Sequence, residues 1–198
     1  MTLLEERPRE SFREGSIPVL ETKRLTLRAP RLEDAKTVAL LANDKRIAEN
    51  TARIPHPYTV SDATDFIAKA NGAGGEVVFL ITQHREIIGA CGITTLDSQP
   101  ELGYWLGAPY WGKGFATEAL HAVIDYAFTD LDHGALNAGA RVTNPASRRV
   151  LEKCGFQWTG VGLYRISAIK SSAPIDRFRL ERGIWSAIKT WGRMKKVM

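Results

Sequence analysis

The sequence has few cysteines and lacks a long apolar run. Only two of its 198 residues, Cys91 and Cys154, are cysteines. Two are too few for a disulfide framework and are typical of buried free thiols in a cytosolic protein. No apolar run approaches the ~18 residues of a membrane span, and the first 20 residues lack the apolar region of a secretory signal. We therefore expect a cytoplasmic protein.

Metal-ligand spacing is also missing. The four histidines, at positions 56, 84, 121 and 133, form no ligand pattern among themselves or with the cysteines. Zinc sites and similar centres require such spacing. We therefore expect no metal.

Most of the chain has no excess of charge of either sign. The 27 Lys and Arg residues against 22 Asp and Glu residues give a net charge of +5 and a pI near 9.3. The stretch from Asp176 onward holds seven basic and two acidic residues, so residues 1–175 are neutral. A basic pI invites a nucleic-acid interpretation, but here a solvated basic face is the interpretation that we favour. A nucleic-acid partner is therefore the less favoured interpretation.

The composition is that of one globular domain. Hydrophobic residues make up 44% and charged residues 25% of the chain, which are ordinary values. We expect a flexible arm over residues 1–20, a single domain over residues 21–183, and a basic C-terminal helix over residues 184–198.

The hydrophobic pattern predicts a mixed α+β fold in the order β-αα-βββ-α-β-α-ββ. Ser61 and Asn144 are the candidate N-caps of two helices, and Pro145 follows Asn144 at a first helical position. The expected strands are 25–28, 77–82, 87–96, 101–106, 136–142, 161–168 and 177–182. The expected helices are 33–42, 61–70, 115–128, 145–154 and 184–195.

Two segments carry the chemistry. In the first, a strand runs into Gly112-Lys113-Gly114 and then into a helix. Glycines let the backbone approach a ligand closely, and the exposed N–H groups of the first helical turn favour an anion such as a diphosphate. An ordinary turn at a helix start is an equally good interpretation of this motif alone.

The second segment runs from Asn144 to Phe156 and includes Ser147. Asn144 can be a simple N-cap, and Ser147 can be a local partner of the backbone. The two segments together, about 30 residues apart with a strand between them, are far more specific than either one alone. Four stretches form the wider pattern: Glu21-Thr-Lys-Arg-Leu-Thr-Leu-Arg-Ala-Pro-Arg-Leu-Glu-Asp34, Gly103-Tyr-Trp-Leu-Gly107, Trp111-Gly-Lys-Gly-Phe-Ala-Thr-Glu-Ala119 and Asn144-x-x-Ser-x-x-Val-Leu-Glu-Lys-x-Gly-Phe156.

In this order the stretches resemble the GNAT superfamily of acetyl-CoA-dependent N-acetyltransferases, and within it the RimJ/RimL-like, ribosomal-protein N-terminal acetyltransferase branch. The resemblance covers about residues 20–183. It implies the GNAT acyl-CoA N-acyltransferase fold, with a central, mixed, mostly antiparallel twisted sheet of about 7 strands flanked by helices. It also implies transfer of an acetyl group from acetyl-CoA to a primary amine. We expect direct attack of the amine without an acyl-enzyme, because neither cysteine has a sequence neighbour that resembles a base.

The resemblance assigns the coenzyme site residue by residue. Backbone N–H groups at the glycine turn and helix start would bind the pyrophosphate. The strand Tyr104-Trp105-Leu106 would pair with the pantetheine arm and polarise the thioester carbonyl. Asn144 would contact the pantetheine or the thioester end. The expected pyrophosphate residues are Gly112, Lys113, Gly114, Phe115, Ala116 and Thr117.

The resemblance also assigns candidates for the catalytic acid and the catalytic base. Glu101 matches the general base of the central strand, although a salt bridge or an exposed strand end would equally account for a glutamate there. Leu151 stands where many members have a tyrosine that protonates the leaving thiolate, and Ser147 matches the serine proposed for that role in this branch. Ile166 stands near the place of a second candidate base. The acceptor pocket of the family falls on residues 43–60, where Asn43, Asn50, His56 and Tyr58 are the polar candidates.

Three functions remain open. The first is an N-acetyltransferase that acts on a protein or ribosomal-protein N-terminal α-amine or on a small-molecule amine. The second is a catalytically weak acyl-CoA-binding sensor or regulatory module, which the missing tyrosine and second glutamate would suit. The third is a protein associated with nucleic acid or ribosomes through its basic C-terminus. The family also commonly forms homodimers, which is an expectation here.

Overall fold

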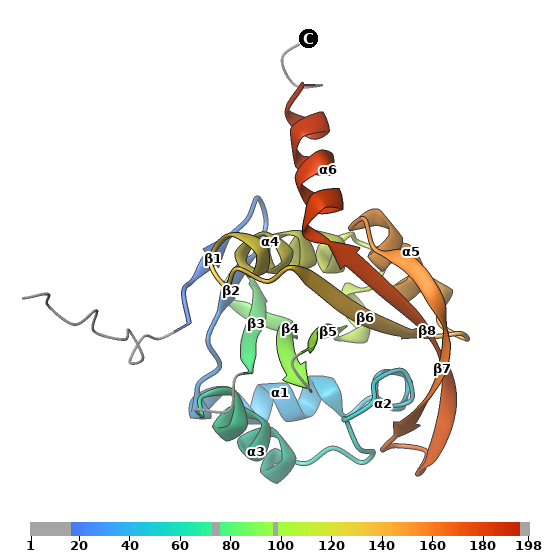
Figure 1. The fold of residues 1–198 in the computed structure, drawn as a ribbon. Coiled ribbons are helices and arrows are strands. Elements are labelled where there is room, and N and C mark those ends of the chain that lie inside the picture. The colour runs from blue at the N-terminus through green and yellow to red at the C-terminus, as the bar shows by residue number, and fades with distance from the viewer. Residues whose placement is uncertain (1–16, 73–75, 97–98, 195–198) are drawn as a thin grey trace, which may run out of the picture.

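The computed structural model describes residues 17–72, 76–96 and 99–194. Most of the expected arm over residues 1–20, and residues 195–198 of the expected C-terminal helix, lie outside these ranges. The described chain forms one eight-stranded sheet in the order β1-β2-β3-β4-β5-β6-β8-β7 (Figure 1). The strands are β1 (Leu20–Glu21), β2 (Thr26–Arg28), β3 (Val77–Gln83), β4 (Glu86–Leu96), β5 (Gln99–Leu106), β6 (Ala135–Arg141), β7 (Gln157–Ile166) and β8 (Ser171–Glu181).

The expected mixed sheet is confirmed, with eight strands in place of about seven. The additional strand is β1, whose two residues are too few to show a periodic pattern. Every neighbouring pair of strands is antiparallel except β5 and β6. The helices are α1 (Ala35–Ala42), α2 (Lys45–Ala48), α3 (Val60–Ala70), α4 (Phe115–Thr129), α5 (Pro145–Lys153) and α6 (Arg182–Met194).

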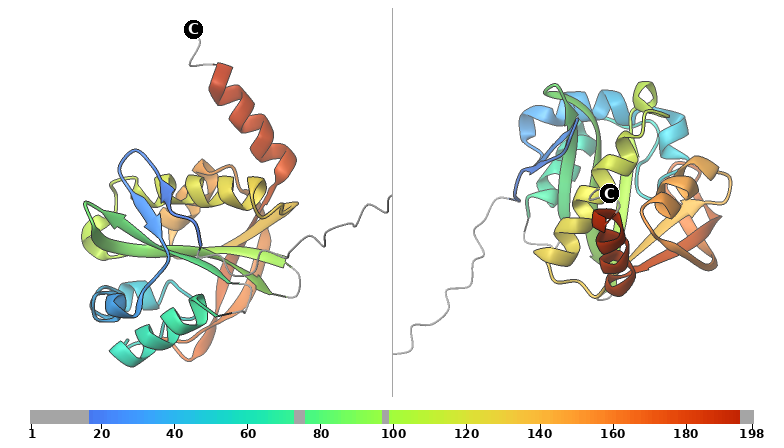
Figure 2. Two further views of the ribbon diagram at one scale, coloured as in Figure 1. Left: turned by 90° about the vertical axis from the view of Figure 1, so that its left-hand side faces the viewer. Right: turned by 90° about the horizontal axis from the view of Figure 1, so that it is seen from above.

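Helices cover both faces of the sheet (Figure 2). On one face α4 packs through Leu120, Val123 and Ala127 against a core that includes Phe79 of β3. On the other face α1 and α3 pack against a second core. The apolar stripe of each helix explains this arrangement, because it must be buried against the sheet.

The sheet divides between β5 and β6. These parallel strands pair only at Glu101 with Asn137 and at Leu102 with Ala138. On its other side β5 stays paired with β4 up to Leu106. The backbone of β5 beyond Leu102 is therefore free of a strand partner on the β6 side, which opens the sheet at its centre.

Local capping explains where the helices next to this opening begin. The side chain of Asn144 accepts a hydrogen bond from the N–H of Ser147 at 3.1 Å, which confirms the predicted N-cap of α5. Ser61 is the wrong cap for α3, because the N-cap is Thr59, two residues earlier, which forms a capping box with Asp62. Thr59 accepts from the Asp62 N–H, and Asp62 accepts from the Thr59 N–H.

The closing helix α6 projects beyond the rest of the domain (Figure 1). Its first turns are fixed to α4: the Trp185 Nε1–H donates to Asp125 at 2.8 Å, and Lys189 forms an ion pair with the same carboxylate. Within the described ranges, every helix is too short or too polar to traverse a lipid bilayer. In the same residues, histidine, cysteine and carboxylate side chains do not gather in threes around a point that would hold a metal ion.

Candidate active site

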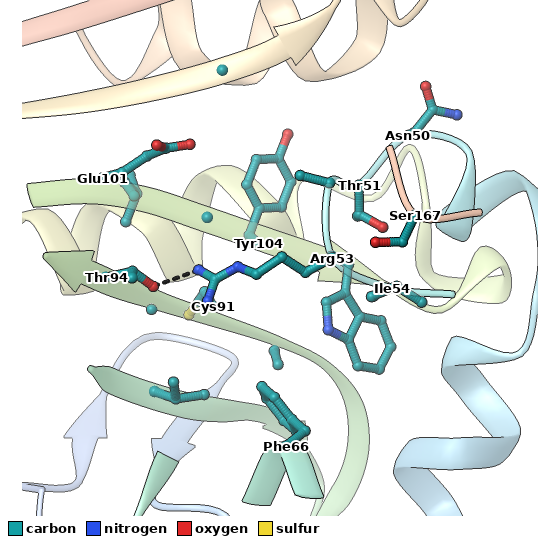
Figure 3. Close-up of a pocket in the computed structure, with 18 of the residues that line it drawn as sticks. Asn50, Thr51, Arg53, Ile54, Phe66, Cys91, Thr94, Glu101, Tyr104 and Ser167 are labelled. Carbon is teal, nitrogen blue, oxygen red and sulfur yellow. Dashed lines mark hydrogen bonds between the residues drawn. The ribbon is translucent and has the colours of Figure 1, made fainter. Parts of the chain in front are cut away.

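A cavity of about 500 Å³ lies where β5 and β6 separate (Figure 3). Its walls come from β4, β5, α3, α5, the β7–β8 hairpin and the loop after α2. The loop is fastened to the hairpin by a hydrogen bond from the Ser167 N–H to the Ala52 carbonyl at 3.0 Å. Side chains from both faces of the sheet reach the cavity, among them Arg53, Phe66, Glu101, Tyr104, Trp105, Ser147 and Tyr164.

The alternation of β5 gives the cavity two different sides. Trp105 packs against the core beneath α1 and α3, and Glu101 shares its face because strand side chains alternate. Tyr104 packs against the opposite core, beneath α4. A carboxylate therefore faces one side of the opening, and a phenol faces the other.

On the α5 side, three predicted site residues lie together. The Tyr104 hydroxyl donates to Ser147 Oγ at 3.0 Å, and the Ser147 N–H donates to the Asn144 side chain. Burial raises the pKa of Tyr104 to about 12 against the opposing effect of the Ser147 hydrogen bond, and the nearby Cys154 contributes to the rise. The phenol is therefore protonated at neutral pH.

On the opposite side, Glu101 is half-buried and forms no ion pair with any described residue. The alternatives of an exposed strand end and a structural salt bridge are thus not what the structure shows. Burial raises the pKa of Glu101, and the charge of Arg53 partly opposes that rise. Arg53 donates to Glu76 at 2.7 Å and to Thr94 at 2.6 Å, and Thr94 pairs with Glu101 across the two strands (Figure 3).

The glycine turn has the backbone geometry of an anion site. Gly112 and Gly114 have φ of +74° and +78°, a region that favours glycine. The first α-helical bond of α4 joins the Glu118 N–H to the Gly114 carbonyl at 3.1 Å. The N–H groups of residues 115–117 precede it and have no helical acceptor. With the dipole of a 15-residue helix behind them, they fit the diphosphate of a coenzyme.

The structure separates the predicted coenzyme residues into two groups. Tyr104 and Trp105 line the cavity, whereas Asn144 and the glycine turn lie outside it, at the starts of α5 and α4. The predicted catalytic residue Ser147 lines the cavity as well. Leu106 is buried at the end of β5, and its carbonyl accepts a hydrogen bond from the Trp111 indole at 2.7 Å.

Part of the expected acceptor segment lines the cavity, although only some of its polar residues reach it. Asn50 and Tyr58 line it. Asn43 instead accepts a hydrogen bond from the Tyr58 N–H at 2.9 Å, and His56 is not among the lining residues. The sequence reasoning missed Arg53, because a single arginine in a proline-flanked loop belongs to no periodic pattern.

Two apolar residues occupy places where the family resemblance puts chemical groups. Leu151 and Ile166 both line the cavity, and both are buried. The cavity therefore has no hydroxyl at position 151 and no carboxylate at position 166. The phenol of Tyr104, which comes from β5, is the additional hydroxyl near Ser147.

Comparison with known proteins gives consistent results. Residues 24–157 match the family model described as acetyltransferase (GNAT) domain. An uncharacterized N-acetyltransferase, p20, from Bacillus licheniformis is 35% identical over 150 residues, which cover 72% of this chain and 84% of that protein. The ribosomal-protein-serine acetyltransferase of Escherichia coli is 32% identical over 82 residues, which cover 40% of this chain and 46% of that protein.

A solved structure shows the same fold. Spermidine N-acetyltransferase from Vibrio cholerae, in complex with CoA and spermine, superposes with a TM-score of 0.70 at 22% identity. The match covers 83% of this chain and 99% of that one. The overall fold is therefore one that another acetyltransferase also has.

Proposed function

Because the chain belongs to the GNAT family of acetyl-CoA-dependent N-acetyltransferases, we propose that it acetylates a primary α-amine by direct attack on the thioester. The acceptor is the N-terminus of a peptide or ribosomal protein, or a small molecule with a similar amine. One observation carries this proposal: Glu101 and the Tyr104–Ser147 pair face opposite sides of a single opening in the sheet.

Each side of the opening suits one half of the reaction. On the Glu101 side the carboxylate accepts a proton from the amine, directly or through a water molecule. The amine nitrogen forms a bond to the thioester carbonyl carbon as the carbon–sulfur bond breaks. On the other side Ser147 donates its proton to the leaving thiolate, and Tyr104 donates a hydrogen bond to Ser147. Free backbone N–H groups of β5 stabilise the developing oxyanion.

The half-buried base favours an α-amine as the acceptor. Deprotonating an amine of pKa ~10.4 at pH 7 costs about 4.6 kcal/mol, whereas an α-amine of pKa ~7.8 costs about 1 kcal/mol. One carboxylate and good positioning are enough for the smaller cost. The Escherichia coli relative is named for a ribosomal-protein substrate, and this supports a peptide N-terminus.

The coenzyme binds along the α4–α5 side in this proposal. Its diphosphate is held by the N–H groups of residues 115–117 and the glycine turn, and its pantetheine arm pairs with β5 in the gap before β6. Asn144 uses its side-chain oxygen as the cap of α5, so its amide NH₂ is the group left to contact the arm. A cytoplasmic location and a homodimer stay predictions.

The alternative function is a sensor that binds acyl-CoA without turning it over. The apolar residues Leu151 and Ile166 in the cavity favour it. The Tyr104–Ser147 hydrogen bond and the half-buried Glu101 favour an enzyme, because both are groups that acyl transfer uses.

Thiol release from acetyl-CoA, measured over a panel of peptides and small amines, tests the proposal. We expect turnover with acceptors that carry an α-amine and little with lysine-like ε-amines. Calorimetric binding of CoA is measured on the same preparation. Tight CoA binding with no turnover on any acceptor would favour the sensor instead.

A further inference from the structure

The turn that joins β1 to β2 rests on the first turn of α4. Glu118 accepts three hydrogen bonds from this turn: from the Thr22 hydroxyl at 2.7 Å, from the Arg24 N–H at 2.7 Å and from Arg24 Nε at 2.6 Å. The contact joins segments 94 to 96 positions apart in sequence. It is therefore a built tertiary contact, and it lies at the helix start that carries the glycine turn.

Arg24 also contacts the glycine turn directly. Its Nη1 donates to the carbonyl of Lys113 at 3.0 Å, and its guanidinium lies 4.6 Å from the centre of the Phe115 ring. A Cβ atom placed on Gly114 would lie 3.5 Å from Arg24 Nη2. One side chain thus holds the Lys113 carbonyl and packs beside Gly114 and Phe115, where the turn enters the helix.

The charge of Glu118 poses a problem for an anion site. Burial acts to raise the pKa of Glu118, but the hydrogen bonds from Thr22 and Arg24 and the charge of Arg24 outweigh it, so its pKa lies below the usual range. An ionised carboxylate in the first turn of α4 would repel a diphosphate bound to the N–H groups beside it. The guanidinium of Arg24, in an ion pair with Glu118, cancels that charge.

We propose that Arg24 is a positioning residue for the coenzyme. It orients the Lys113 carbonyl toward itself and neutralises Glu118, which leaves the N–H groups at the start of α4 free to hold the diphosphate. This inference rests on the proposed placement of the diphosphate at the glycine turn. It assigns a function to the Thr22–Leu25 turn, which lies outside the cavity.

The test compares CoA with pantetheine, which lacks the diphosphate and the 3′-phosphoadenosine attached to it. Calorimetry or competition gives the Kd of each ligand for the full chain and its R24Q variant. We expect R24Q to weaken CoA binding by about tenfold or more, because it leaves the ionised Glu118 uncompensated beside the diphosphate, and to leave pantetheine binding unchanged. In turnover, the KM for acetyl-CoA should rise while kcat stays the same. R24K, which keeps the charge but not the fork of donors, should lose less.

R31Q is the matched control, because Arg31 lies in the same segment and forms an exposed ion pair with Glu33. It should leave both affinities unchanged. An R24Q variant that binds CoA as well as the wild type would overturn the inference, and so would equal losses with CoA and pantetheine. If R24Q does not fold, R24K decides by the same two comparisons. These binding measurements need no acceptor, so a failure here is distinct from the absence of turnover that would count against the proposed function.

Discussion

The phenolic oxygen of Tyr104 lies 3.0 Å from the hydroxyl oxygen of Ser147. Through this pair β5 and α5 meet across the opening in the sheet. The family resemblance places a thiolate-protonating tyrosine at position 151, where this chain has a buried leucine. A phenol from another element therefore stands close to the serine proposed for the same role.

Ser147→Ala should lower kcat for acetyl transfer by about a hundredfold, because it removes the proposed proton donor to the thiolate. The KM for acetyl-CoA should change little. Tyr104→Phe keeps the ring packing and removes only the supporting hydroxyl, so its loss in kcat should be smaller. Steady-state kinetics on the two variants and the double variant measure this.

The double variant gives the sharper result. If the phenol acts through Ser147, adding Tyr104→Phe to Ser147→Ala should cost no further activity. Losses that multiply would mean that the two hydroxyls act separately.

Glu101→Gln should lower the activity of the enzyme by an amount that depends on how basic the acceptor amine is. With an α-amine acceptor the loss in kcat/KM at pH 7 should stay under about tenfold, because little free energy is needed to deprotonate the amine. A more basic amine should lose much more. Parallel assays with a peptide N-terminus and a lysine side chain give the two values, and equal losses would show that Glu101 does not act as the base.

The pH profile should depend on Arg53. Burial raises the pKa of Glu101 and the charge of Arg53 opposes it. Because a base must be ionised, kcat should fall as the pH drops through the pKa of Glu101. Arg53→Met removes the opposing charge, so the acidic limb should move to higher pH. Arg31→Gln is the control, and an unmoved limb in Arg53→Met would contradict the assignment.

The Arg28–Asp34 ion pair should stabilise the domain. Asp34 is buried and accepts two hydrogen bonds from Arg28 at 2.8 Å and one from the Arg31 N–H. Asp34→Ala leaves the arginine unpaired and should lower the free energy of unfolding by about 3 kcal/mol in urea titrations. Glu33→Ala breaks only an exposed pair and should cost under about 1 kcal/mol.

The Arg28–Asp34 pair also predicts how the free energy of unfolding depends on pH. Burial acts to raise the pKa of Asp34, but the hydrogen bonds and charge of Arg28, together with the Arg31 N–H, lower it overall. A carboxylate with a lowered folded-state pKa stabilises the fold above its unfolded pKa of about 3.9 and loses that contribution as the pH falls. The difference between wild type and Asp34→Ala should therefore shrink in acid. A constant difference down to pH 2 would contradict this.

The sequence predicted the core elements well because their signals are local. The apolar stripe of α4, the continuous apolar run of β3 and the Asn144-Pro145 cap each depend on residues within a few positions of one another. The glycine turn was found for the same reason, since its positive φ values need glycine wherever the turn lies.

What the sequence did not predict depends on distant partners. β8 begins at Ser171, six residues before the expected start, because pairing with β7 holds a polar stretch that includes Pro174 in the sheet. Arg53 reaches Glu76 and Thr94, and Arg24 reaches Glu118. Such contacts follow from the topology, and neither arginine has a neighbour in sequence that would predict its partner.

The division of the sheet also bears on how readily its two halves separate. Two residue pairs between β5 and β6 are all that join β1–β5 to β6–β8 through backbone pairing in the described chain. This joint has less strand pairing to hold it closed than the neighbouring β4–β5 and β6–β8 pairs have. A pantetheine arm paired with β5 would fill the gap between the two halves of the sheet and restrict their separation. Backbone amides beside the joint should therefore exchange with deuterium more slowly once CoA is bound. Rigidity of the enzyme would then rise and fall with the supply of its acetyl donor.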